Sequence, residues 1–210
     1  MSNRESVPDA APPCPWTRER LTERLAGPPP PPDPRDLHNI PVPEGVRVTE
    51  AAVMVPIVCR PPALYVLLTQ RTPHLLDHAG QISFPGGRVE PEDRDRDETA
   101  LRETEEEIGL PRGRVSVIGR LPTYEIPTGF RITPVVGWIE PPFELKPDPF
   151  EVASVFEVPF DHFLDPERYL RREYRFRGRH RHYLAIPYEG RYIWGATAAM
   201  LHSFARMLED

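Results

Sequence analysis

Apolar stretches of strand character alternate with shorter helical ones along most of this chain. Residues 46–59 and 64–70 are apolar and rich in β-branched side chains, and the sequence Arg60-Pro61-Pro62-Ala63 separates them. We therefore expect two paired strands there. Similar patterns predict further strands at 114–123, 130–139, 169–176 and 182–186, with a short one between 80 and 87.

Helical character is clearest between Asp95 and Gly109. Asp95 and Glu98 have the spacing of a capping pair, and Gly109 is a residue type that commonly ends a helix. A short amphipathic helix is expected at 16–26, where Trp16, Leu21 and Leu25 form an apolar edge. A helical turn is predicted at 160–164 and a closing helix at 196–208.

The order of these elements predicts one domain preceded by an arm. Strands followed by a helix, repeated without regular βαβ alternation, favour a mixed sheet between helices, an α/β (α+β) fold. Prolines at 28–32 break regular structure and favour an extended course. We expect a proline-rich arm with a short helix at 1–45, lying on the domain or mediating contacts, and a folded domain at 46–210.

Composition narrows the class of protein. A chain of 210 residues suits one domain with a sizeable core. The net charge of -6, without a block of Lys and Arg, argues against a nucleic acid as partner, whereas small phosphorylated substrates remain open. No signal peptide or apolar span of membrane length is visible, so no membrane contact is expected. The two cysteines, Cys14 and Cys59, form no disulfide framework, which favours a reducing cytoplasm.

The most informative chemistry lies on the predicted helix at 95–109. Glu106 and Glu107 follow Glu103 by three and four residues, which places three carboxylates on one helical face. Like charges so close together repel one another. A hard divalent cation such as Mg²⁺ or Mn²⁺ removes that repulsion and also binds phosphate oxygens. The pattern therefore predicts a metal-dependent chemistry on a phosphorylated substrate.

This segment resembles the Nudix box, G-x5-E-x7-R-E-U-x-E-E-x-G-U, in which U is an aliphatic residue. The matching residues are, in order, Gly87, Arg102, Glu103, Glu106, Glu107, Gly109 and Leu110. Three features differ, since Asp93 stands where the first Glu belongs, one extra residue separates it from Arg102, and Thr104 replaces an aliphatic residue. The resemblance implies a Nudix-type α/β/α sandwich, with a mixed central sheet flanked by helices.

The residues before the box resemble the signature of the coenzyme A pyrophosphatase branch of Nudix hydrolases, LLTxR[SA]xxxRxxxGxxxFPGG. The matching residues are Leu67, Leu68, Thr69, Arg71, Gly80, Phe84, Pro85, Gly86 and Gly87, whereas Thr72 replaces Ser or Ala and Leu76 replaces the second Arg. Segments 123–137, 148–159 and 193–201 add to the resemblance.

This resemblance implies hydrolysis of the pyrophosphate bond of coenzyme A or its thioesters, giving 3',5'-ADP and 4'-phosphopantetheine or its acyl form. Two alternatives stay open. One is a Nudix pyrophosphatase of ADP-ribose, NADH or another nucleotide, and the other is a nucleotide-binding module without turnover. The sequence leaves a homodimer open as well.

The family resemblance also implies roles for individual residues. Glu103, Glu106 and Glu107 are expected to hold metal ions that bridge the pyrophosphate and lower the pKa of a bound water. Arg102 lies four residues before Glu106, so it is expected to orient a carboxylate rather than contact the substrate.

Two further roles each have two candidates. Glu90 and Asp93 are equal candidates to replace the missing box glutamate, as a metal ligand or as a brace of the loop. For the general base, Glu151 is the first candidate and Glu125 the second, although either could be an ordinary surface carboxylate.

Substrate contacts are expected from residues close to the box. Arg71 offers paired donors suited to a 3'-phosphate or diphosphate oxygen, and Arg131 could do the same, although an outward strand arginine is the simpler interpretation. Phe84, like Phe130, could line the pocket or belong to the core. The expected substrate-binding residues are thus Arg71, Gly86, Gly87, Phe84 and Arg131, the two glycines because their backbone can approach phosphate closely.

Overall fold

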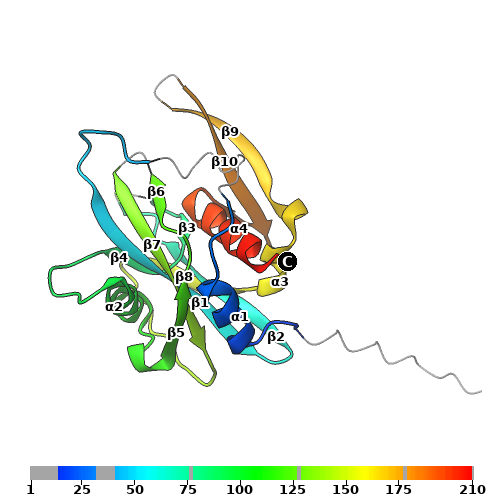
Figure 1. The fold of residues 1–210 in the computed structure, drawn as a ribbon. Coiled ribbons are helices and arrows are strands. Elements are labelled where there is room, and N and C mark those ends of the chain that lie inside the picture. Colours follow the sequence, from blue (N-terminus) through cyan, green and yellow to red (C-terminus); the bar gives the residue numbers. More distant parts are fainter. Residues whose placement is uncertain (1–13, 32–40, 76–77, 127–128, 177–178, 210) are drawn as a thin grey trace, which may run out of the picture.

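The computed structural model describes residues 14–31, 41–75, 78–126, 129–176 and 179–209 (Figure 1). Leu76 lies outside the described residues, as do residues 1–13 and 32–40 of the proline-rich arm. In chain order the helices and strands are α1 Arg18–Ala26, β1 Thr49–Arg60, β2 Ala63–Arg71, β3 Ile82–Ser83, β4 Gly86–Arg88, α2 Arg96–Ile108, η1 Arg112–Arg114, β5 Val115–Arg120, β6 Tyr124–Ile126, β7 Phe130–Ile139, β8 Val152–Pro159, α3 Phe160–Leu164, η2 Pro166–Arg168, β9 Leu170–Phe176, β10 Arg179–Tyr188, β11 Arg191–Trp194 and α4 Ala196–Leu208.

The large sheet is mixed, as the element order predicted. β1 lies at its centre, antiparallel to β2 and β4 and parallel to β7. The path β3-β2-β1-β7-β5 runs through the sheet, and β8 pairs with β2 while β6 pairs with β7. The parallel pairing aligns the long apolar strands β1 and β7 over their whole shared length. Both faces of the sheet are covered at these strands, so most of β1 and the second half of β7 are buried.

Alternate residues of β1 face opposite layers. Val55 and Ile57 belong to the main core with α1, α3 and α4, whereas Ala52 and Met54 pack with Ala100 of α2. Helices therefore cover both faces of the sheet, and Figure 1 shows α2 on one side and α1 and α4 on the other. The predicted α/β/α sandwich is confirmed.

A second sheet lies beyond α4, and the sequence did not predict it as a separate unit. β10 pairs antiparallel with both β9 and β11. Leu184, Ile186 and Ile193 of this small sheet join the same core as Phe204 of α4. The helix is consequently buried on most of its circumference rather than along one stripe. Three strands were missed as well: β6, β8 and β11.

The N-terminal helix α1 packs on the domain through the apolar edge that the sequence indicated. Leu21 and Leu25 are buried, with 0% and 7% of their surface exposed. Gly119 in β5 makes room for this contact, because a Cβ atom at that position would overlap Leu25. The boundary at residue 46 stays a prediction, but α1 itself is part of the core.

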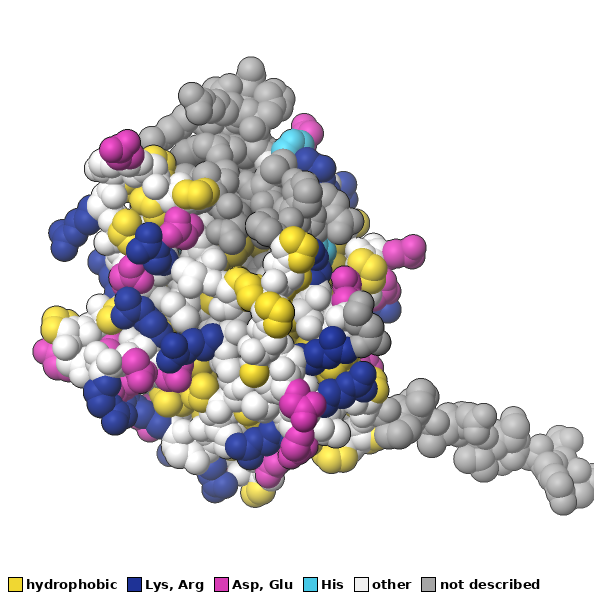
Figure 2. Space-filling model, viewed as in Figure 1, with side chains coloured by type: hydrophobic (Ala, Val, Ile, Leu, Met, Phe, Trp, Pro, Cys, Tyr) yellow, Lys and Arg dark blue, Asp and Glu magenta, His cyan; other side chains and the backbone are white. Residues whose placement is uncertain are grey.

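The surface mixes charges of both signs. On the face in Figure 2, Lys and Arg side chains are interspersed with Asp and Glu rather than gathered in one stripe. Within the part of the chain that the structure describes, no helix has both the length and the apolarity that a membrane span requires.

Candidate active site

The ends of α2 are set by the two residues that the sequence singled out. The Asp95 side chain accepts a hydrogen bond from the Glu98 backbone N–H at 3.0 Å, and Gly109 adopts a left-handed conformation with φ 67°. The Glu98 carboxylate accepts from the N–H of Arg94 instead of returning to Asp95, so the capping pair forms in one direction only. These ends define where the glutamates of the last two turns lie.

The three glutamates of the helix differ in exposure. The side chain of Glu106 is 57% exposed, whereas those of Glu103 and Glu107 are 18% and 8% exposed. Burial raises the pKa of Glu107 to about 8, with Arg71 opposing the shift and the charges of Glu103 and Glu151 adding to it. Burial also raises the pKa of Glu103, and Arg102 opposes that shift. The two buried carboxylates and Glu151 therefore form one repelling group.

Arg102 connects this group to the acidic loop. Its guanidinium donates to both carboxylate oxygens of Asp93 at 3.0 Å, to Glu103 at 2.9 Å and to Glu106 at 3.1 Å. A further bond reaches the carbonyl of Arg88. One planar fork thus holds two helix carboxylates and the loop together, which is a role that lysine could not fill.

Asp93 braces the acidic loop. Only 3% of its side chain is exposed, and it accepts from Arg102, from the Thr99 hydroxyl and from the backbone N–H of Glu90. The hydrogen bonds from Arg102 hold the pKa of Asp93 well below its usual range. Glu90, by contrast, is 57% exposed and 4.0 Å from Arg102. Of the two candidates that the sequence left equal, Asp93 has the place and contacts of the brace.

The paired glycines bring the backbone close to these carboxylates. A Cβ atom on Gly87 would overlap the Glu103 carboxylate, and one on Gly86 would overlap Ala52 and Val53 of β1. Gly86 has φ 156°, at the edge of the range that side chains disfavour, and its backbone acts to lower the pKa of Glu107. A larger residue would displace the Glu103 carboxylate at Gly87 and the backbone of β1 at Gly86.

Arg71 extends the site at the end of β2. Its Nη1 lies 3.9 Å from Oε1 of Glu107, and its buried Nε has no hydrogen-bond partner among the described residues. An unpaired buried N–H beside a carboxylate group indicates a place for an anion. Glu151, at the start of β8, completes this edge, since its charge acts on both Glu103 and Glu107.

Several predicted residues lie elsewhere. Phe84 is 3% exposed and packs in the core on the α4 side, so the expectation that it lines a substrate pocket is corrected. Arg131 is bound by Glu50 at 3.1 Å and by Glu125 at 2.6 Å, as expected of an outward strand arginine.

This arginine cluster also holds the second candidate base. Glu125 accepts from Arg131 and from the N–H of Val42. Glu50 of the same cluster binds Arg96, the first residue of α2. That residue lies about three turns, roughly 16 Å, from Glu107 along the helix. Arg131 therefore binds both Glu125 and Glu50, and this cluster reaches α2 at its first residue.

A divalent ion fits the donor set. Among the described residues, no three side chains of His, Cys, Asp or Glu already converge at metal-ligand positions. Glu103 and Glu106 are both bound by the same nitrogen of Arg102, so their carboxylates lie on the same side of α2. Burial is the main cause of the raised pKa of Glu103 and Glu107, and repulsion from neighbouring carboxylates adds to it. A hard cation relieves repulsion of this kind.

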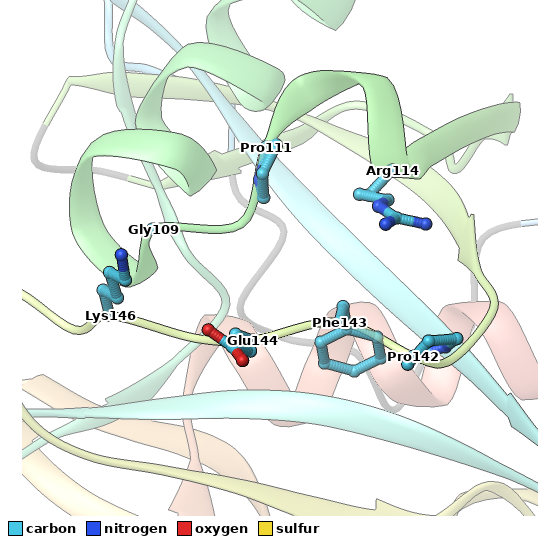
Figure 3. Close-up of a pocket in the computed structure, with 7 residues that line it drawn as sticks. All are labelled: Gly109, Pro111, Arg114, Pro142, Phe143, Glu144 and Lys146. Carbon is cyan, nitrogen blue, oxygen red and sulfur yellow. The ribbon is translucent and has the colours of Figure 1, made fainter.

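A separate hollow lies past the C-terminal end of α2. It has a volume of about 430 Å³ and includes Gly109, Arg114 and Phe143 in its wall. Figure 3 shows its residues coming from the helix end and from the segment that follows β7. None of Glu103, Glu106 and Glu107 lines it, so this hollow is distinct from the carboxylate face.

The segment that leads to Glu151 is held to α2 by backbone hydrogen bonds. The backbone N–H groups of Lys146 and Asp148 donate to the carbonyls of Ile108 and Glu107, at 2.8 and 2.9 Å. Such backbone bonds leave no pattern in residue types. Thr72 also contacts this segment. The sequence marked Thr72 only because it replaces the Ser or Ala of the upstream signature, and no other sequence signal indicated this contact.

Known proteins include several that are similar to this chain in sequence or in fold. A sequence model of the NUDIX domain matches residues 48–183. A protein of Pectobacterium atrosepticum named "Uncharacterized Nudix hydrolase NudL" is 44% identical over 163 residues, covering 77% of this chain and 83% of its own. Its namesake from Yersinia enterocolitica is 44% identical over 160 residues, covering 75% and 80%. The crystal structure of the Nudix hydrolase RenU of M. smegmatis is similar with a TM-score of 0.47 and 21% identity, over 57% of this chain and 82% of that one.

Proposed function

The chain belongs to the Nudix family of hydrolases, and on that premise we propose that it hydrolyses the pyrophosphate bond of coenzyme A or its thioesters. One water is added across the P–O–P bridge. The P–O bond to the leaving phosphate breaks, and the products are 3',5'-ADP and 4'-phosphopantetheine or its acyl form. The two free thiols, Cys14 and Cys59, are compatible with a reducing cytoplasm.

The observation that carries the proposal is the position of Arg71. This residue belongs to the upstream signature LLTQR, and its unpaired Nε and its contact with Glu107 put a cation at the edge of the carboxylate face. A substrate with phosphate groups at both the bridge and the 3' position offers this guanidinium an anionic partner. The signature favours coenzyme A over ADP-ribose, NADH or nucleoside triphosphates.

Glu103, Glu106 and Glu107 are the residues that would hold Mg²⁺ or Mn²⁺. When bound, the ion would supply charge neutralisation of the pyrophosphate and activation of the attacking water. Arg102 keeps Glu103 and Glu106 on the same side of the helix through its bonds to both. Gly86 and Gly87, whose missing side chains let β1 and the Glu103 carboxylate approach closely, would meet the phosphates with their backbone.

Glu151 is the group that we propose as the acceptor of the water proton. It lies close enough to Glu103 and Glu107 for its charge to act on both, and Glu125 is bound to Arg131 in the other cluster. The leaving phosphate departs with its negative charge, which the guanidinium of Arg71 would balance.

A substrate panel tests this proposal. Purified protein with Mg²⁺ or Mn²⁺ is incubated with coenzyme A, acetyl-coenzyme A, ADP-ribose, NADH and nucleoside triphosphates, and products are identified by mass. Release of 3',5'-ADP from coenzyme A at the highest kcat/KM supports the proposal, provided that Glu107→Gln abolishes it. Faster cleavage of ADP-ribose or NADH would move the assignment to another substrate, and binding without cleavage would indicate a module without turnover.

A further inference from the structure

Thr72 follows directly on β2 and ties it to the segment that carries Glu151. The side chain is 4% exposed. Its hydroxyl donates to the carbonyl of Phe150 at 2.7 Å, and its backbone N–H donates to the carbonyl of Glu151 at 2.9 Å. One buried residue therefore holds two consecutive carbonyls, which flank the Cα atom of Glu151.

These two bonds stand where the sheet ladder is interrupted. The register between β2 and β8 shifts between Gln70 and Arg71, and Arg71 is the last residue of β2 in the ladder, opposite Val152. An interrupted ladder leaves the backbone freer to move. The hydroxyl of Thr72 supplies a bond to Phe150 that an apolar side chain could not supply.

The same segment is anchored at its other end. Lys146 and Asp148 donate backbone N–H groups to the last turn of α2, as described above. Asp148 in turn accepts from the N–H of Phe150 at its carboxylate and from the N–H of Val152 at its carbonyl. Glu151 thus sits between two anchors, the carboxylate helix on one side and Thr72 on the other.

We propose that Thr72 is a positioning residue that holds Glu151 at the edge of the carboxylate face. This inference rests on the proposed function, in which Glu151 accepts a proton from water. Thr72 contacts no reacting atom and acts only by restricting the backbone of Glu151. A base displaced by about 1 Å can lose on the order of a hundredfold in rate, so the restriction matters for turnover more than for binding.

Two substitutions separate the hydroxyl from the rest of the side chain. Thr72→Val keeps the branched shape and removes the donor, and we expect kcat to fall roughly ten- to hundredfold with KM within about threefold. Thr72→Ser keeps the donor and should restore most of kcat. Thr197→Val is the matched control, because that buried hydroxyl also donates to a distant carbonyl, that of Ile82 at 3.2 Å. Its kcat should stay within about twofold of the wild type.

The coupling between Thr72 and Glu151 is the decisive kinetic readout. If Thr72 acts through Glu151, then Thr72→Val combined with Glu151→Gln should be within about twofold of Glu151→Gln alone, because the group being positioned is already absent. If the fold losses in kcat of the two single variants multiply in the double variant, the proposal is overturned. So would a Thr72→Val enzyme with the wild-type kcat.

Amide hydrogen exchange tests the same idea without turnover. In Thr72→Val, a peptide covering residues 146–152 should exchange about tenfold faster than in the wild type, while Thr197→Val leaves it unchanged. If the wild type cleaves no substrate, the proposed function fails and the exchange rates still decide the role of Thr72. Unchanged exchange in Thr72→Val would refute the positioning role whatever the activity.

Discussion

Replacing Glu107 by glutamine should stabilise the metal-free protein, and more so at higher pH. The wild-type side chain is 8% exposed, and its burial raises the carboxyl pKa from 4.5 to about 8. Below pH 4.5 the folded and unfolded chains both carry the proton, so there is no difference. As the pH rises toward 8 the unfolded chain ionises while the folded chain keeps its proton, so the free energy of unfolding falls through this window.

The size of the effect follows from the shift. Each unit of pKa corresponds to about 1.4 kcal/mol, so the upper bound above pH 8 is about 5 kcal/mol. Rotation of the side chain or entry of water would lower the cost, and we expect about 2 to 5 kcal/mol. Glutamine has a similar shape and no charge, so this cost disappears in the variant.

Urea denaturation in EDTA at pH 5 and pH 8 measures the difference between wild type and Glu107→Gln. The variant should be more stable than the wild type, and its advantage in free energy of unfolding should be larger at pH 8 than at pH 5. Glu98→Gln is the control, because a hydrogen bond from Arg94 lowers the pKa of Glu98 and both pH values lie above it. Its difference from the wild type should not change. A Glu107→Gln difference that is equal at pH 5 and pH 8 would refute the account of a buried, protonated carboxyl.

Three further outcomes follow from the same contacts. Glu106→Gln should keep the fold and lower turnover on the order of a hundredfold in saturating Mg²⁺, measured by initial rates, and wild-type rates would dismiss the metal face. Arg71→Ala should raise KM for coenzyme A by roughly one to two orders of magnitude and for dephospho-coenzyme A far less, whereas equal losses would assign it to the pyrophosphate. Asp93→Asn should lower the free energy of unfolding by about 3 kcal/mol, measured in urea, since it leaves the fork of Arg102 half paired, and a change below about 1 kcal/mol would contradict its role as brace.

Local sequence signals were sufficient for the helix that carries the carboxylates. Asp95 and Gly109 mark its ends because capping depends on residues a few positions apart, and the spacing of Glu103, Glu106 and Glu107 follows from the helical period. The same holds for β7 and α4, whose observed bounds equal the predicted ones. The order of the elements predicted the mixed sheet between helices, and the family resemblance implied the α/β/α sandwich.

Other features depended on contacts between distant segments. β8 and β11 were missed because their pairing partners, not their own patterns, make them strands. Phe84 has the same neighbours in the sequence whether it lines a pocket or fills the core, and only the packing of α4 on the sheet closes it off. Arg131 could not be separated from the site until its bonds to Glu50 and Glu125 were visible.

The candidate site shows the same division. Residue spacing was enough to show which residue types meet on one helical face, because that depends on positions within a single helix. The folded chain was needed to show that Asp93 rather than Glu90 braces the loop and that Thr72 binds the segment of Glu151. These choices depend on burial and on hydrogen bonds across separate elements, and such interactions form only once the sheet and its helices have assembled.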